Sequence, residues 1–174
     1  MDNTSSIDPV LFRTTMGCFT TGVTVITTAV ADQIYGITAN AFLSVSLDPP
    51  LVLVSVNKHG RMHQRMLESS HYGVTILGEQ QETLSRHFGG RPVEGLEPTY
   101  SWEHGVPLLA DAVAYIVART IETHQAGDHT LFLGHVEYLA NTRRSPLLFS
   151  RGSYGQIASE SMRAALGYEW EYMW

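Results

Sequence analysis

The sequence predicts a mainly β protein with short helices, whose strands form an antiparallel barrel. Runs of β-branched and apolar residues recur along the chain, and short polar or glycine-containing turns separate them. The helical segments are short and do not alternate regularly with the strands. A doubly wound parallel sheet needs that alternation, so a closed antiparallel sheet fits the pattern better.

The first third of the chain predicts one helix and three strands. Asp8 suits the N-cap of a helix over residues 8–18, with Pro9 in its first turn. The strands are expected at residues 23–30, 37–47 and 51–57, with a hairpin connection at 31–36. The pair Pro49-Pro50 ends the second strand because proline cannot continue a hydrogen-bonded ladder.

The remainder predicts two helices and further strands. The helices span residues 60–68 and 79–88, where Met62 and Met66, and then Leu84 and Phe88, recur on one face. Strands are expected at 71–77, 112–122, 130–140 and within 146–157, a long loop runs to Pro107, and THQAGDH (123–129) joins the two long strands. With no repeat and no linker, we expect one domain over residues 1–174.

Composition limits the classes of function. The chain has 174 residues, 44% of them apolar and 16% charged, as in a globular protein. A net charge of −6 argues against nucleic acid or an anionic membrane as partner. The polar N-terminus is unlike a signal peptide, and no apolar run is long enough for a membrane helix, so we expect a cytoplasmic protein.

Common metal and catalytic motifs are missing. Cys18 is the only cysteine, which excludes an intrachain disulfide and a cysteine-based zinc site. His59 and His63 have a ligand-like spacing, but Gly60 places His59 before the helix and no glutamate completes the motif, so we expect no metal. The patterns G-x-S-x-G, G-x-x-x-x-G-K-[ST] and G-x-G-x-x-G do not occur, and any nucleotide must be held by another scaffold.

Three segments are more polar than simple strands and turns require. In ITANAF, Thr38 and Asn40 interrupt an apolar strand and offer hydrogen bonds to a heteroaromatic ring, although a sheet edge or a bulge would explain them too. In SVNKHG, a serine, an asparagine and the only lysine, Lys58, cluster before a helix and suit an anion, although ordinary capping is the alternative. In AGDH, Asp128 and His129 occupy a connection that Asp-Gly would make more simply.

The residues that carry a resemblance are GITANAFLSVSLDPPLVLVSVNK, LSRHF, AGDHTLFLGHV and SYG. In this order, over about residues 10–157, they resemble the short-chain flavin reductases, the reductase partners of two-component flavin-dependent monooxygenases. The resemblance implies a Greek-key split β-barrel homodimer with flavin near the subunit interface. It also implies NAD(P)H as hydride donor and FAD, with FMN as the alternative, as acceptor.

The resemblance also implies roles for individual residues. Thr38, Ala39, Asn40 and Ala41 would line the isoalloxazine ring, and the family often has serine where this chain has Ala41. The ribityl-phosphate end would be held by Ser55, Asn57 and Lys58, assisted by Ser85 and Arg86. His129 would face the nicotinamide as the catalytic residue, and Tyr154 would flank the same pocket.

In this interpretation the hydride passes from nicotinamide C4 to flavin N5, and the protein stacks the two rings within roughly 3–3.5 Å. Two alternatives stay open: an enzyme similar to pyridoxamine phosphate oxidase, and a flavin-binding protein without activity. The aromatic tail at 158–174 lies outside the resemblance. Its alternating aromatic residues predict a strand that packs on the barrel or on its dimer partner. A cover over the flavin, or a docking point for the oxygenase, is the alternative.

Overall fold

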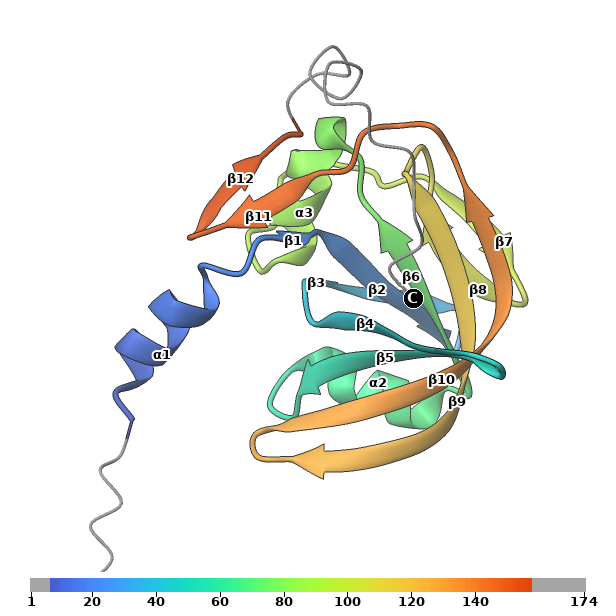
Figure 1. Cartoon of the computed structure of the whole chain (residues 1–174). Coiled ribbons are helices and arrows are strands. Elements are labelled where there is room, and N and C mark those ends of the chain that lie inside the picture. Colours follow the sequence, from blue (N-terminus) through green and yellow to red (C-terminus); the bar gives the residue numbers. More distant parts are fainter. Residues whose placement is uncertain (1–6, 158–174) are drawn as a thin grey trace, which may run out of the picture.

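The computed structural model describes residues 7–157, and its main body is one seven-stranded antiparallel sheet (Figure 1). The strands lie in the order β3-β2-β6-β9-β10-β5-β4. Their bounds are β2 Thr24–Val30, β3 Gln33–Ala39, β4 Phe42–Leu47, β5 Pro50–Asn57, β6 His71–Ile76, β9 Ala114–Ala126 and β10 His129–Asn141. The predicted mainly β, antiparallel class is confirmed.

The sheet curls so that its two edges approach one another. β3 and β4 are the edge strands, yet only Asn40 and Ala41 separate them in the chain. The Cα atoms of Ala39 and Phe42 therefore lie at most about 11 Å apart, whereas seven flat strands would span about 29 Å. The β9–β10 hairpin sits between β5 and β6, which follow one another in sequence around helix α2 (Arg61–Glu68). This order gives the expected Greek-key barrel.

The prediction of one continuous strand over residues 37–47 was wrong. The chain leaves the sheet at Asn40 and re-enters it at the opposite edge, where Phe42 pairs with Val54 of β5. β3 also begins earlier than expected, at Gln33, because the connection from β2 needs only Ala31 and Asp32. A segment that pairs with β2 and then with β5 cannot remain one straight strand.

The three predicted helices are confirmed. Helix α1 (Pro9–Met16) is capped by Asp8, whose carboxylate accepts hydrogen bonds from two backbone N–H groups of the first turn. In α2, Met62 and Met66 are buried, as their spacing predicts. The 79–88 segment forms a 3₁₀ turn, η1 (Glu79–Gln81), followed by α3 (Glu82–Phe88).

Two small hairpins were not predicted. The loop expected before Pro107 contains β7 (Tyr100–Glu103) and β8 (Val106–Leu109), and all of β8 is buried. The expected last strand is instead a hairpin of β11 (Leu148–Ser150) and β12 (Ser153–Gly155), beside the short strand β1 (Thr21–Gly22). Figure 1 shows the β11–β12 hairpin next to α3, away from the β9–β10 turn. The predictions for residues 158–174 lie outside the described residues.

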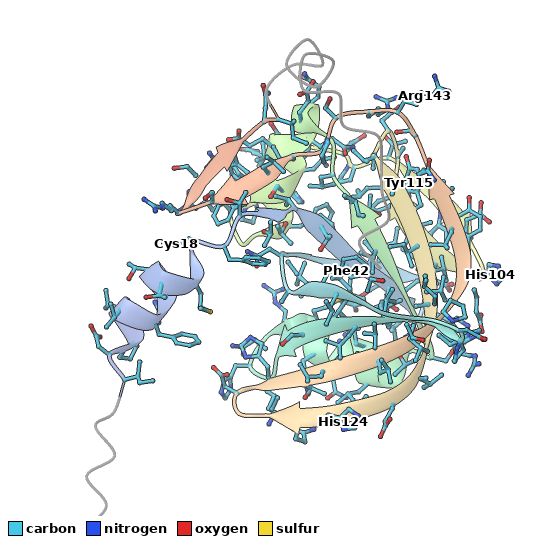
Figure 2. The ribbon with its side chains drawn as sticks, viewed as in Figure 1. Cys18, Phe42, His104, Tyr115, His124 and Arg143 are labelled. Carbon is cyan, nitrogen blue, oxygen red and sulfur yellow. The ribbon has the colours of Figure 1, made fainter. Side chains whose placement is uncertain are left out.

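The core lies inside the curl, beneath α2. Its largest cluster joins residues from β2, β5, α2, β6, β9 and β10, with Phe42 of β4 packed against it (Figure 2). Tyr72 is fully buried, its hydroxyl donates to the Phe132 carbonyl at 3.3 Å, and burial raises the pKa of this phenol. Packing in the core therefore holds β5 and β10 in place, and the ends of these two strands carry part of the candidate site.

Candidate functional site

The β9–β10 turn is tighter than the sequence predicts. Both strands continue into the expected connection, and only Gly127 and Asp128 lie between them. Gly127 has a φ of +59°, which favours glycine at the first position of a two-residue turn. His129 is thus not a turn residue: it is the first residue of β10, and it pairs with both Ala126 and Asn57. The pairing with Asn57 fixes His129 at the start of β10, beside the end of β5.

Lys58 ties the end of β5 to this turn. Its backbone N–H donates to the Asp128 carbonyl at 2.9 Å, and its Nζ donates to the Gly127 carbonyl at 2.7 Å. An ammonium has three donors, so two remain for a ligand. The Asn57 side-chain oxygen accepts from the backbone N–H of His59 at 2.8 Å. The structure therefore brings together the predicted residues Asn57, Lys58 and His129.

Asp128 orients the imidazole of His129. Nδ1 of His129 and Oδ1 of Asp128 lie 2.7 Å apart, and the two side chains are 39% and 71% exposed. The hydrogen bond with His129 lowers the pKa of the Asp128 carboxyl, so the carboxylate is ionised at neutral pH and accepts a hydrogen bond from Nδ1–H of His129. This pairing is present at neutral pH and is lost as the pH falls through the lowered pKa of Asp128. Nε2 is the ring nitrogen that remains for a ligand.

A second group of predicted residues lines two adjoining cavities of about 440 and 120 Å³. The cavities lie between the end of β3, α3 and the β11–β12 hairpin, and they share Thr38, Ser85, Phe149 and Tyr154. Six of the proposed site residues line one or both: Thr38, Ala39, Asn40, Ser85, Arg86 and Tyr154. The larger cavity is in the size range of small-molecule sites.

Hydrogen bonds and ring contacts fix the walls of these cavities. Ser85 is fully buried, and its Oγ lies 2.8 Å from the Tyr154 hydroxyl. Thr38 Oγ1 donates to the Ser85 carbonyl at 2.6 Å, which joins β3 to α3. The Tyr154 ring packs edge-on against Phe149, and the Arg86 guanidinium lies 5.0 Å from the centre of the same ring. The cavities are therefore lined by aromatic side chains from the β11–β12 hairpin and by polar side chains from β3 and α3.

Ala41 and Ser55 connect the two groups. The Ser55 N–H donates to the Ala41 carbonyl at 3.1 Å, so the corner between β3 and β4 adjoins the strand that ends at Lys58. Ser85 and Arg86, however, lie with Thr38 and Tyr154, and no hydrogen bond within residues 7–157 joins them to Lys58. The proposed residues therefore form two linked groups, one at each side of the Asn40–Ala41 corner.

Several cavity residues were not predicted from the sequence. They are Val23, Glu82, Gly89, Arg91, Phe149, Gly152 and Ser153. Gly89 and Arg91 lie within three residues of the end of the LSRHF segment, and that proximity was the one available signal for these two residues. Ser153 lies in the SYG segment next to Tyr154, whereas Phe149 reaches the cavity only because β11 and β12 form a hairpin, which was not predicted.

Within residues 7–157, no three histidine, cysteine or acidic side chains gather where they could hold a metal ion. No helix in the same range combines the length and apolar character needed to cross a membrane.

Solved structures with the same curled antiparallel sheet are flavin reductases, so the fold is the split β-barrel of the flavin reductase type. The family model for the flavin reductase like domain matches residues 16–158. An NADH-dependent flavin reductase of a Rhodococcus species is 43% identical over 154 residues, which are 87% of this chain and 88% of the relative. The reductase subunit HsaB of a flavin-dependent monooxygenase of Mycobacterium tuberculosis is 36% identical and covers 92% of this chain and 89% of its own.

Solved structures agree with this match. Flavin reductase PheA2 in its native state has a TM-score of 0.86 and 44% identity, covering 88% of this chain and 100% of its own. The NADH:FAD oxidoreductase SgcE6 of Streptomyces globisporus, in complex with NAD and FAD fragments, has a TM-score of 0.81 and 38% identity, covering 88% and 95%. The chain belongs to the flavin reductase like family.

Proposed function

We propose that this chain is an NADH-dependent flavin reductase that supplies diffusible reduced flavin to a separate flavin-dependent monooxygenase. The reaction class is that of its relatives. The observation that carries the proposal is the grouping of six proposed residues around the two cavities, linked through Ala41 and Ser55 to Lys58 and His129. The alternatives similar to pyridoxamine phosphate oxidase, or without activity, find no support among the relatives.

The residues fit a flavin. The aromatic wall of Phe149 and Tyr154 suits a planar ring, and the exposed Asn40–Ala41 corner between the edge strands β3 and β4 can meet its polar rim. When both are bound, nicotinamide supplies a hydride and the flavin accepts it. The chain's own residues hold the two rings together and exclude water. That role explains why the chain needs no strong general base.

The roles that we assign to individual residues follow the two linked groups of site residues. Thr38, Ala39, Asn40 and Ala41 contact the ring, and Tyr154 closes its pocket. Ser55, Asn57 and Lys58 hold a phosphate end. Ser85 and Arg86, which the resemblance places as assistants at that end, line the cavity beside α3 and we assign them to its wall. His129, held by Asp128, meets the nicotinamide nucleotide through Nε2.

A homodimer in the cytoplasm, with one domain over residues 1–174, completes the proposal. Apolar side chains alternate on the outer face of the edge strand β4, where Leu43, Val45 and Leu47 are 57%, 45% and 75% exposed. An exposed apolar stripe on an edge strand favours burial against another chain, and a second copy is the simplest partner. Sedimentation should give the mass of two chains; a monomer at all concentrations would contradict this part of the proposal.

NADH oxidation without any organic substrate tests the activity. We expect the protein to accelerate NADH consumption when FAD, FMN or riboflavin is present, because flavin itself is the acceptor. An enzyme that oxidises a bound organic molecule would need that molecule. NADH consumption no faster than with free flavin would contradict the proposal.

Lys58→Ala is expected to weaken FMN or FAD binding by about 1.5–3 kcal/mol, the contribution of a charge-assisted hydrogen bond to phosphate. Riboflavin has no phosphate, so its affinity should barely change. Arg61→Ala removes a nearby exposed charge at the start of α2 and is the matched control. Titrations followed by flavin fluorescence measure all three affinities. Equal losses for riboflavin and FMN would place the phosphate elsewhere.

His129→Ala should raise the NADH KM several-fold, on the order of 1 kcal/mol for a lost hydrogen bond, while flavin affinity stays the same. The matched control is His124→Ala, on the same hairpin and exposed (Figure 2). Steady-state kinetics at saturating flavin separate the two cases. A fall in kcat alone would mean that His129 aligns the rings. A fall in flavin affinity with normal NADH kinetics would move His129 into the flavin site.

A further inference from the structure

Arg91 is held beside the larger cavity by a chain segment that folds back onto α3. The N–H groups of Gly89, Arg91 and Val93 donate to the Ser85 carbonyl, the Arg86 carbonyl and Nδ1 of His87 at 2.9, 3.0 and 3.1 Å. Between them, Gly90 has a φ of +87°, a conformation that favours glycine. The backbone that carries Arg91 is therefore fixed at the cavity wall.

The charges around this cavity do not cancel. Glu82 accepts hydrogen bonds from Nε and Nη2 of Arg86 at 2.8 and 2.5 Å, so these two residues neutralise one another. Arg91 lines the same cavity and forms no ion pair within residues 7–157. The lining thus carries one surplus positive charge in a chain whose net charge is −6. Such a charge favours an anionic group.

This cation is distinct from Lys58. Lys58 contacts the β9–β10 turn, whereas Arg91 lies with α3 and the β11–β12 hairpin. A single phosphate beside Lys58 would leave Arg91 without a role. The proposed reaction brings together two nucleotides, flavin and NADH, and each of them carries phosphate.

Resting on the proposed function, we infer that Arg91 forms a second phosphate-binding position, which holds a phosphate of a nucleotide in the cavity between α3 and the β11–β12 hairpin. The guanidinium can donate two parallel hydrogen bonds to phosphate oxygens. Arg86, already paired with Glu82, stays over the Tyr154 ring and shapes the wall. The phosphate belongs either to flavin or to the nicotinamide nucleotide, and titration separates the two sources.

Binding titrations with Arg91→Gln test this inference without relying on turnover. The ligands are riboflavin, FMN, FAD and NAD⁺, the last with flavin present. We expect about a tenfold loss for the nucleotide whose phosphate Arg91 contacts, and no loss for riboflavin. A loss confined to FAD identifies its second phosphate, an equal loss for FMN and FAD identifies the phosphate they share, and a loss for NAD⁺ alone identifies the nicotinamide nucleotide.

Arg143→Gln removes the same charge from a loop that lies away from the β11–β12 hairpin in Figure 2, and it should change none of these affinities. Arg91→Lys should recover part of the loss, because it restores the charge but not the paired hydrogen bonds. Unchanged affinity of Arg91→Gln for all phosphate-bearing ligands would overturn the inference, and so would an equal loss for riboflavin. The proposed function fails separately, if the wild-type protein does not oxidise NADH with riboflavin.

Discussion

Replacing Gly134 with alanine is expected to lower the free energy of unfolding by about 1–3 kcal/mol, the usual cost of overpacking a core. A Cβ at this position of β10 would meet the Tyr72 hydroxyl and would lie 2.8 Å from the Ala118 Cβ. Tyr72 cannot move aside easily, because it is fully buried and its hydroxyl donates to the Phe132 carbonyl. The strand that carries His129 would therefore shift or strain.

Urea unfolding of Gly134→Ala and Gly22→Ala measures this effect. A Cβ at Gly22 would meet nothing within 4 Å, so that variant should keep the stability of the wild type. If both variants unfold at the wild-type urea concentration, the contact between Tyr72 and β10 is not as tight as described.

Replacing Tyr154 with phenylalanine is expected to cost about 1–3 kcal/mol of stability, because it leaves the hydroxyl of Ser85 buried without its partner. Ser85 is fully buried, and its Oγ lies 2.8 Å from the Tyr154 hydroxyl. Flavin affinity should fall as well, since the pair fixes the cavity wall. The aromatic ring itself remains, so stacking on Phe149 is kept.

The double variant Tyr154→Phe with Ser85→Ala is the test of this explanation. Removing both polar groups leaves no unsatisfied hydroxyl, so most of the lost stability should return. Unfolding free energies of the two single variants and the double variant form the cycle. Additive losses would show that the two hydroxyl groups do not act as a pair.

Local patterns in the sequence predicted the elements that depend on neighbouring residues. Asp8 before Pro9 predicted the start of α1, and the spacing of Met62 and Met66 predicted the buried face of α2. The strand runs with β-branched residues were found in the correct order. These features need no knowledge of which strands pair.

Features that depend on distant pairing were missed or wrong. The break at Asn40–Ala41 follows from the return of β4 to β5, and β8 forms a strand because it pairs with β7 and packs under β2 and β6. The local sequence of residues 37–47 does not indicate that β4 pairs with β5, and that of residues 100–109 does not indicate that β7 pairs with β8. His129 was placed in a turn because Gly and Asp suggest a longer connection than the two residues used.

The candidate site also contains residues that the sequence pointed to and residues that only the folded chain brings into place. The residues named by the resemblance come together in the structure as two linked groups, but Arg91, Glu82 and Phe149 were not named. They reach the cavity through the end of α3 and the β11–β12 hairpin, so only the assembled fold reveals them. The arrangement of charge around the cavity, where Arg86 has an ionic partner and Arg91 has none within residues 7–157, was likewise invisible in the sequence.

Anaerobic mixing of the protein with free flavin in large molar excess over the protein, and with NADH in excess over the flavin, tests the central claim most directly. Absorbance of oxidised flavin follows the reaction, and a mixture without protein corrects for direct reduction. We expect the whole flavin pool to be reduced over many turnovers, because each reduced flavin leaves the open cavity at the β3–β4 corner and another takes its place. Reduction of only one flavin per chain, or a rate equal to that without protein, would contradict the account.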